Sequence, residues 1–375
     1  MRFALNTVVW GSGYVDLLLN HSLPTLFSPG NLIDSPWTDQ FVYQLMTTRA
    51  DLALIQPSAI FRRLEQTVDV QVLLIDDIQV DETEATHKYN RVSLAQSMGI
   101  RHAVGSCDGF LALYPDFVYS KNALSAVVQR LAEGYRAVLN PIPFMSLEAV
   151  RDGLFRLHGM EIGTSVGREI HISPRRLVEL NIMYPHPVNR GFEMDSGEHA
   201  EWPGIFTWPV PGQGQIMRSF HLHPTGIRLD ANDEALFGHF EVSIDDEFVS
   251  RVLSIDDKLA FVTDSDDLAM CSLRGVNDPP QPMPGSRADL GRAARWAEEF
   301  SGLMLRYFTR QEFRWHYTDM TDPNWERRSK ESEAFTRRLR KRLVVPDLLM
   351  QIEDPVGYDA RRRRSRYFQH RNAAV

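Results

Sequence analysis

The first 150 residues alternate short apolar runs with stretches whose apolar residues recur at helical spacing. The runs predict buried strands, and the helical period predicts helices that cover them. The predicted strands are Phe3–Trp10, Phe41–Thr47, Val68–Ile75, Phe110–Tyr114 and Arg136–Leu139, and the predicted helices are Tyr14–Leu26, Arg49–Ile55, Thr86–Met98 and Leu124–Glu133. This alternation predicts an α/β fold with a parallel or mixed sheet between two layers of helices.

The pattern changes after residue 150. Trp202–Pro211 is rich in proline and aromatic residues and predicts an irregular loop, because proline interrupts central strands. The later predictions are strands within Gln215–Leu229, Glu241–Phe248 and Leu259–Leu273, a linker at Pro279–Pro284, and amphipathic helices at Ala288–Phe308 and Arg327–Leu343. We therefore expect an α/β half over residues 1–150, a second half of the same domain over 151–285, and a helical extension over 286–375.

Composition narrows the class of protein. The net charge of −8 argues against a general nucleic-acid binder, and two cysteines give no disulfide framework and no cysteine-built zinc site. No run approaches the roughly 20 apolar residues of a membrane-spanning helix, and no signal segment opens the chain. A cytoplasmic location is expected. The basic stretch Arg337–Arg342 is read mainly as a solvated helix face, with peripheral contact to anionic lipid as the alternative.

Asp116 is the first candidate for chemistry. It follows the predicted strand Phe110–Tyr114 at the turn where α/β sheets place ligand-binding side chains. Its carboxylate could bind Mg²⁺ or Mn²⁺, which prefer oxygen ligands and often take few protein carboxylates when phosphates complete the shell. The alternative is a helix N-cap or a turn former.

His221 and His223 are two residues apart on a predicted strand, so their side chains are expected on one face. Together they could hold a metal or a diphosphate, whereas a histidine satisfied by backbone groups is the alternative. His223 is favoured because Pro224 ends the strand there. Either histidine matters only if the fold brings it near Asp116.

Other polar positions lie at the predicted ends of strands or the starts of helices. Asp76 could accept a hydrogen bond from a ribose or a base, and Lys88 could bind a phosphate. At the turn of Trp10 and Gly11, the glycine allows the backbone to approach a nucleoside closely and the Trp10 ring could stack on the base. Turn capping is the alternative for Asp76. Asp264 is either a base at the cleft or one of several solvated acids in a turn. The signatures of α/β hydrolases, zinc proteases and kinases are absent.

The N-terminal half, about the first 150 residues, resembles nucleotide-diphospho-sugar transferases of the GT-A fold, in particular bacterial proteins of surface-polysaccharide pathways. The residues that carry the resemblance are the strand FALNTVVWG, LPTLFSPGNL (Leu23–Leu32), Thr47-Thr48, HKYN (His87–Asn90) and YPDFVYSKNAL (Tyr114–Leu124), with FHLHP and VTDSDD as weaker extensions. The resemblance implies a GT-A-like mixed, mostly parallel sheet flanked by helices, to which the pattern of the later residues adds an irregular middle region and a helical C-terminal part.

The resemblance also implies roles for single residues. Trp10, Gly11, Thr47 and Asp76 would border the nucleoside, Lys88 the phosphates, and Asp116 a divalent cation, Mn²⁺ or Mg²⁺, with His223 as its late ligand. The family carries an Asp-x-Asp element, whereas this chain has Tyr114-Pro115-Asp116 and keeps only the second acid.

We therefore expect a glycosyltransferase that moves a sugar from a nucleotide-diphosphate donor to a glycan or lipid-linked acceptor, with Asp264 assisting the attacking hydroxyl. Residues 151–285 would form the acceptor side. An inactive binding protein of the same fold and a sugar-phosphate nucleotidyltransferase are the two alternatives. The second usually carries a basic, glycine-rich loop, and Gly11-Ser12-Gly13 has no basic neighbour.

Overall fold

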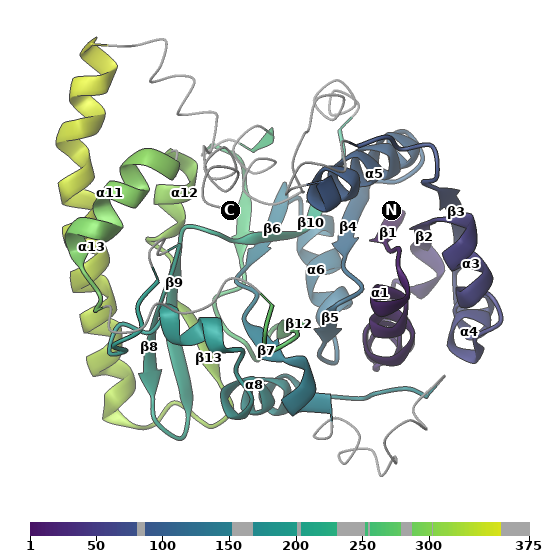
Figure 1. Cartoon of the computed structure of the whole chain (residues 1–375), viewed down its shortest axis with the longest axis horizontal. Coiled ribbons are helices and arrows are strands. Elements are labelled where there is room, and N and C mark those ends of the chain that lie inside the picture. Colours follow the sequence, from purple (N-terminus) through teal and green to yellow (C-terminus); the bar gives the residue numbers. More distant parts are fainter. Residues whose placement is uncertain are drawn as a thin grey trace.

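The computed structural model describes residues 1–80, 87–151, 168–200, 204–230, 252–253, 256–278, 287–301 and 303–353 (Figure 1). Its centre is a seven-stranded sheet with the order β11-β6-β10-β4-β1-β2-β3. The strands are β1 (Phe3–Val8), β2 (Phe41–Thr47), β3 (Asp69–Leu74), β4 (Gly109–Leu113), β6 (Ala137–Asn140), β10 (His223–Arg228) and β11 (Leu259–Phe261). The expected mixed, mostly parallel sheet is confirmed.

The direction of the strands decides where their ends meet. β1 pairs in parallel with β2 and β4, β2 pairs in parallel with β3, and β11 pairs in parallel with β6. β10 runs antiparallel to both β4 and β6, so it is the single reversed strand of this sheet. The carboxyl ends of the six parallel strands therefore share one edge with the start of β10, and polar residues there can converge on a ligand.

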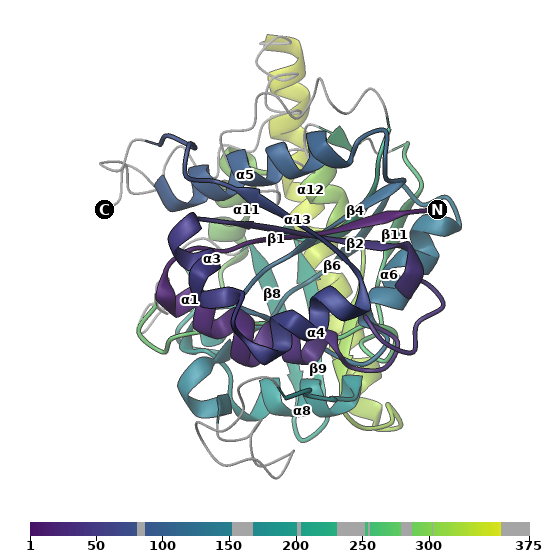
Figure 2. The same cartoon turned by 90° about the vertical axis from the view of Figure 1, so that its right-hand side faces the viewer.

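Helices cover both faces of this sheet. One face shares a hydrophobic cluster with α1 (Ser12–Leu17), α2 (Leu23–Leu26), α3 (Arg49–Ile55), α4 (Ala59–Thr67) and α6 (Ala123–Ala132), and the other face shares a second cluster with α5 (His87–Ala103) and with helices beyond residue 170. Alternate residues of β4 belong to different clusters: Phe110 and Ala112 to one, Leu111 and Leu113 to the other. Figure 2 shows α5 on one side of β1 and β2, with α1, α3 and α4 on the other.

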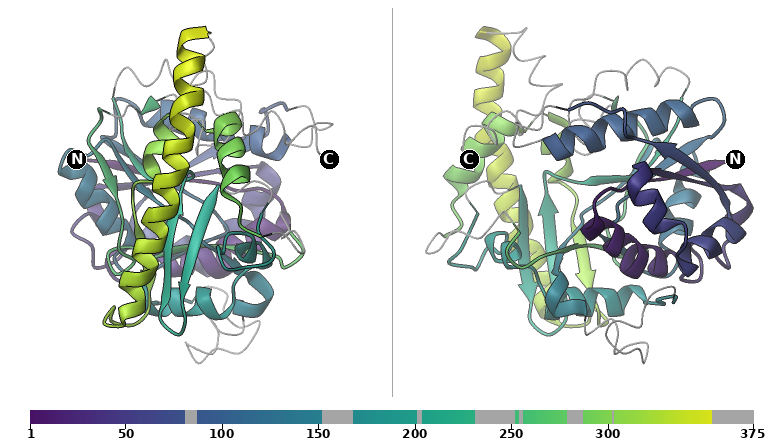
Figure 3. Two further views of the ribbon diagram at one scale, coloured as in Figure 1. Left: turned by 90° about the vertical axis from the view of Figure 1, so that its left-hand side faces the viewer. Right: turned by 45° about the vertical axis from the view of Figure 1, so that its right-hand side comes forward.

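Two smaller sheets complete the described part. The first has the order β5-β12-β7, with β5 (Phe117–Tyr119), β12 (Met270–Arg274) and β7 (Phe144–Ser146). The second has the order β13-β9-β8, with β13 (Phe313–His316), β9 (Gly214–Ser219) and β8 (Ile205–Val210). The later α-helices include α8 (Pro174–Met183), α11 (Leu290–Phe300), α12 (Leu303–Phe308) and α13 (Pro323–Glu353), and the described residues also form the short helices η1 (Leu18–Ser22), η2 (Thr38–Gln40) and η3 (Pro187–Gly191). The long helix α13 packs across β8 and β9 (Figure 3).

Several sequence predictions are confirmed closely. The strand Phe41–Thr47 and the helix Arg49–Ile55 have the predicted bounds. The elements α4, α8, β5, β7 and β13 were not predicted. The strands among them have only three or four residues, so their apolar runs are too brief to stand out. The predictions at Glu241–Phe248 and Pro279–Pro284 lie outside the described residues.

The predicted loop at Trp202–Pro211 is wrong, because Ile205–Val210 forms β8. Pro209 is tolerated since β8 is an edge strand, with β9 on one side only. Within the described ranges, no helix has both the length and the apolar character needed to cross a bilayer.

Candidate functional site

The carboxyl edge of the central sheet collects the candidate residues. Thr47 ends β2, Asp76 follows β3, Asp116 follows β4, and His223 opens β10. Gly11 follows β1 at the start of α1. The topology therefore places at one edge residues that are far apart in the chain.

Asp116 lies in a turn between β4 and β5. Its backbone oxygen accepts from the Leu273 amide at 2.7 Å, and its Oδ2 accepts from the Ser272 hydroxyl at 2.9 Å. It does not cap the next helix, since Asn122 is the N-cap residue of α6. Burial raises the pKa of the Asp116 carboxyl, opposed by the Ser272 hydrogen bond and by the nearby Arg274 charge. The carboxylate is thus held in place at an electrostatic cost.

Tyr14 and Arg274 are within electrostatic range of this carboxylate. Burial raises the pKa of the Tyr14 phenol, and the Asp116 charge raises it further. The Tyr14 side chain is still 45% exposed. An aromatic hydroxyl and a guanidinium thus belong to the same electrostatic environment as Asp116.

His223 lies beside the same turn. Its ring contacts those of Tyr114 and Phe117 edge-on, with centroids 5.2 and 5.5 Å away. Burial lowers the pKa of His223 to about 4, opposed by its hydrogen bond to the Ala112 carbonyl. Nε2 is buried and has no hydrogen-bond partner among the described residues. We assign the Ala112 bond to Nδ1, which leaves Nε2 as the unprotonated nitrogen of a neutral ring, the form that binds metals.

The prediction that His221 and His223 share a strand face is wrong. β10 begins at His223, and His221 lies before it, where its amide donates to Ser219 Oγ and its carbonyl accepts from the same hydroxyl. The His221 ring packs against Trp296, at 5.4 Å between centroids. The Ser219 hydroxyl thus fixes a bend that separates the two imidazoles.

The turn after β1 is held from α3. Gly11 has a φ of 82°, and its amide donates to Asp51 Oδ2 at 3.0 Å. The Arg91 guanidinium lies 5.8 Å from the centre of the Trp10 ring, so α5 reaches the same turn. Lys88 lies one turn earlier in α5, and its side chain is outside the described part.

The other two nucleoside candidates differ in their surroundings. Asp76 is exposed and accepts from the Arg49 amide at 3.2 and 3.3 Å, so it stabilises the start of α3. This is the capping alternative, and the outer lone pairs of the carboxylate still face solvent. Thr47 is fully buried, and its hydroxyl has no hydrogen-bond partner among the described residues.

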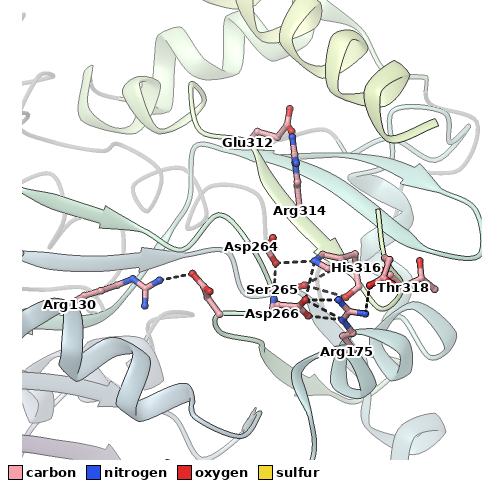
Figure 4. Close-up of polar contacts among 11 residues, drawn as sticks. Arg130, Arg175, Asp264, Ser265, Asp266, Glu312, Arg314, His316 and Thr318 are labelled. Atoms are coloured by element: carbon pink, nitrogen blue, oxygen red, sulfur yellow. Dashed lines mark hydrogen bonds and ion pairs between the residues drawn. The ribbon is translucent and has the colours of Figure 1, made fainter. Parts of the chain in front are cut away.

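A second polar cluster joins the loop after β11 to β13 and α8 (Figure 4). His316 is buried; its Nε2 lies 2.9 Å from Asp264 Oδ1 and its Nδ1 lies 2.8 Å from the Thr318 carbonyl. Ligand atoms of Asp264, Asp266 and His316 lie within 4.8 Å of one another, so they could hold a metal ion. Arg175 forms three hydrogen bonds of 2.9 to 3.1 Å with Asp266 and lowers the pKa of that carboxyl. The Arg175 guanidinium therefore already supplies a positive charge beside Asp266, one of the three possible metal ligands.

The sequence analysis missed Ser272, Arg274, Arg175 and His316. Ser272 lies 156 residues after the carboxylate it contacts, and His316 lies 52 residues after Asp264. No local motif marks these contacts. The one local signal is that Ser272 and Arg274 are two residues apart, so a strand there places both side chains on one face.

No protein-family model matches the chain, and no curated protein matches it. Among solved structures, GalNAc-T7 with UDP, GalNAc and Mn²⁺ has a TM-score of 0.37 at 11% identity, covering 88% of this chain and 54% of that one. Apo mouse xyloside xylosyltransferase 1 has a TM-score of 0.27 at 13% identity, covering 44% and 61%. The 4-diphosphocytidyl-2C-methyl-D-erythritol synthase of Anaerococcus prevotii has a TM-score of 0.26 at 11% identity, covering 38% and 56%. The chain spans less than two thirds of each of the three.

The buried, neutral His223 gives a pH-dependent stability. Its pKa is about 4 in the fold against 6.5 as the ordinary value, so the unfolded chain binds the proton more readily between these values. The free energy of unfolding should therefore fall as the pH drops from 6.5 towards 4. His21, whose pKa burial also lowers to about 4, contributes in the same direction.

In His223→Gln, the loss of stability between pH 7 and pH 4.5 should be smaller than in the wild type by about 2 kcal/mol. Urea unfolding at the two pH values measures it. His102→Gln, an exposed position at the end of α5, is the control and should leave the loss unchanged. Equal losses in the wild type and His223→Gln would contradict the prediction.

Proposed function

We propose that the protein is a glycosyltransferase that moves a sugar from a nucleotide-diphosphate donor to a carbohydrate or surface-glycan acceptor, free or lipid-linked. The observation that carries the proposal is the convergence of Asp116 and His223 at the carboxyl edge of the parallel strands. Burial disfavours the charged form of the Asp116 carboxyl, and the neutral His223 ring has a buried nitrogen without a hydrogen-bond partner among the described residues. Both groups would therefore gain from a bound ligand.

The two groups fit a divalent cation. Asp116 offers carboxylate oxygen and His223 offers Nε2, and phosphate oxygens of a donor would complete the shell. Bound Mn²⁺ or Mg²⁺ would neutralise negative charge on the departing nucleoside diphosphate. Asp116 alone stands where the family has two acids, which supports the inactive binding protein as the second candidate.

The nucleoside would lie over the ends of β1 to β3. The Gly11 turn is pinned by Asp51 and leaves backbone open to a ligand, and Trp10 presents a ring with Arg91 near it. Thr47 would offer its unpartnered hydroxyl and Asp76 its solvent-facing oxygens. Lys88, in the first turn of α5, would meet the phosphates.

The acceptor would lie towards β11. Asp264 follows β11, which is three strand positions from β4, or about 14 Å at the usual strand spacing. That separation leaves room for a donor sugar and an acceptor hydroxyl between the two carboxylates. Asp264 would accept the proton of the attacking hydroxyl, with His316 holding the carboxylate in position at 2.9 Å.

A thermal-shift screen tests the proposal. UDP-, GDP-, CMP- and dTDP-linked sugars are added with and without Mn²⁺, and at least one donor should raise the melting temperature. The rise should be lost in Asp116→Ala and kept in Asp108→Ala, which lies at the opposite end of β4. If no donor stabilises the folded wild type, the transferase proposal is wrong. If a donor binds and no transfer occurs with any acceptor, the binding protein is the better assignment.

A further inference from the structure

One face of β12 points towards the Asp116 turn. Side chains alternate along a strand, so Ser272 and Arg274 lie on the same face. The Ser272 hydroxyl donates to Asp116, which fixes the direction of that face. Leu273 points the other way, into the large hydrophobic cluster on the opposite side. Arg274 is therefore one pleat beyond the residue that holds Asp116.

Phe144 supports the Arg274 side chain. Phe144 pairs with Ser272 across β7 and β12, so its ring lies on the same face as Arg274. The guanidinium carbon lies 3.9 Å from the centre of that ring. Stacking on an aromatic face orients the planar guanidinium and leaves its N–H groups directed outward, ready for an anion.

Arg274 has no ion pair and no side-chain hydrogen bond among the described residues. Other poorly exposed arginines differ: Arg218 pairs with Glu312 at 2.9 Å, and Arg328 pairs with Glu331 at 2.7 Å. Arg274 is only partly exposed, and a guanidinium removed from water without an acceptor is costly. A bound anion would supply the missing acceptor.

The Arg274 charge acts on groups of the candidate site. It opposes the rise in the pKa of Asp116 and of Tyr14 that burial causes, and it contributes to the lowered pKa of His186. Arg274 is therefore within electrostatic range of the turn that carries Asp116, on the strand face that the Ser272 hydrogen bond defines.

We propose that Arg274 binds the diphosphate of the nucleotide sugar, opposite Asp116, and stabilises it as it leaves. This inference rests on the proposed function. It adds a protein-borne positive charge to a site in which one acid of the usual pair is missing. The diphosphate would be bound through Arg274 whether or not Mn²⁺ is present, because the guanidinium offers a planar pair of donors to phosphate oxygens.

Calorimetry of nucleoside and nucleoside diphosphate separates this contact from the rest of the site. Uridine is compared with UDP, guanosine with GDP, and thymidine with dTDP, each with EDTA and with Mn²⁺. The diphosphate should bind more tightly than its nucleoside in EDTA. Arg274→Gln should reduce that advantage about 10- to 100-fold and leave the nucleoside affinity unchanged. Arg274→Lys should keep part of it.

The control is Arg228→Gln, at the opposite end of β10, which should bind like the wild type. If Arg274→Gln keeps the full diphosphate advantage while Asp116→Ala loses the donor, the inference about Arg274 is wrong and the proposed function stands. If the wild type binds none of the nucleotides, the proposed function fails and the inference falls with it. Circular dichroism of each variant verifies that it is folded.

Discussion

Replacing Asp116 by asparagine is expected to lower the proposed sugar transfer strongly and to make the fold more stable. Burial raises the pKa of the Asp116 carboxyl, which means that the ionised group is less favourable in the fold than in the unfolded chain. Asparagine keeps an oxygen that can accept from the Ser272 hydroxyl and removes the charge. We expect a gain of about 1 kcal/mol in the free energy of unfolding, as at other strained functional sites.

Activity should move in the opposite direction. Under the proposed function, the charge that would bind a cation or orient the donor is lost, so transfer should fall about 100-fold or more. Urea unfolding at pH 7.5 and a transfer assay with the donor found by the screen measure the two effects. The gain should shrink at low pH, where the wild-type carboxyl becomes neutral. A variant less stable than the wild type at pH 7.5 would contradict the argument. Asp116→Ala, which removes the Ser272 acceptor, should not share the gain.

The second large effect concerns Arg218, which connects β9 to α13. Its side chain is 4% exposed and donates to Glu312 at 2.9 Å, to the Arg310 carbonyl at 2.8 Å and to Ser332 at 3.1 Å. Arg218→Ala would leave these acceptors in a poorly solvated place. Removing one partner of a buried pair costs about 3 kcal/mol or more, so we expect at least that loss in the free energy of unfolding.

Arg314 offers a matched control, because it pairs with the same Glu312 at 3.0 Å from a side chain that is 49% exposed. Exposed pairs contribute about 0 to 1 kcal/mol, so Arg314→Ala should cost less than 1 kcal/mol. Urea unfolding of both variants under one buffer makes the comparison. Equal losses in the two variants would show that burial of the Arg218 network does not determine its contribution.

The sequence predicts best those elements whose signal is local and long enough. The strand at Phe41–Thr47 is buried along its whole length between β1 and β3 and is mostly apolar, so a continuous apolar run marks it in the sequence. The prediction of a loop at Trp202–Pro211 was wrong because the deciding information is not local. Proline argues against a central strand, and nothing local shows that β8 would be an edge, where proline is accepted.

The candidate site was predictable only in part. Asp116 could be found because it follows an apolar strand. His223 was chosen because Pro224 was expected to end a strand there, and that expectation is wrong, since β10 begins at His223 and continues through Pro224. The sheet topology still brings both residues to one edge. The rest depends on pairings between distant segments. Ser272 reaches Asp116, and Arg274 comes onto the same strand face, because β12 pairs with β5. His221 is kept away from His223 because Ser219 bends the chain. Whether the residues at this edge bind a nucleotide stays a prediction.

The reversed strand β10 has a consequence for synthesis on the ribosome. β4 and β6 do not pair with each other, since β10 fills the space between them and emerges more than 80 residues after β6. Until that segment has been translated, both strands have an unsatisfied row of backbone groups that could pair with other chains. Closure of the sheet must then wait for a contact between distant parts of the polypeptide, which makes the nascent chain dependent on protection from aggregation during this interval.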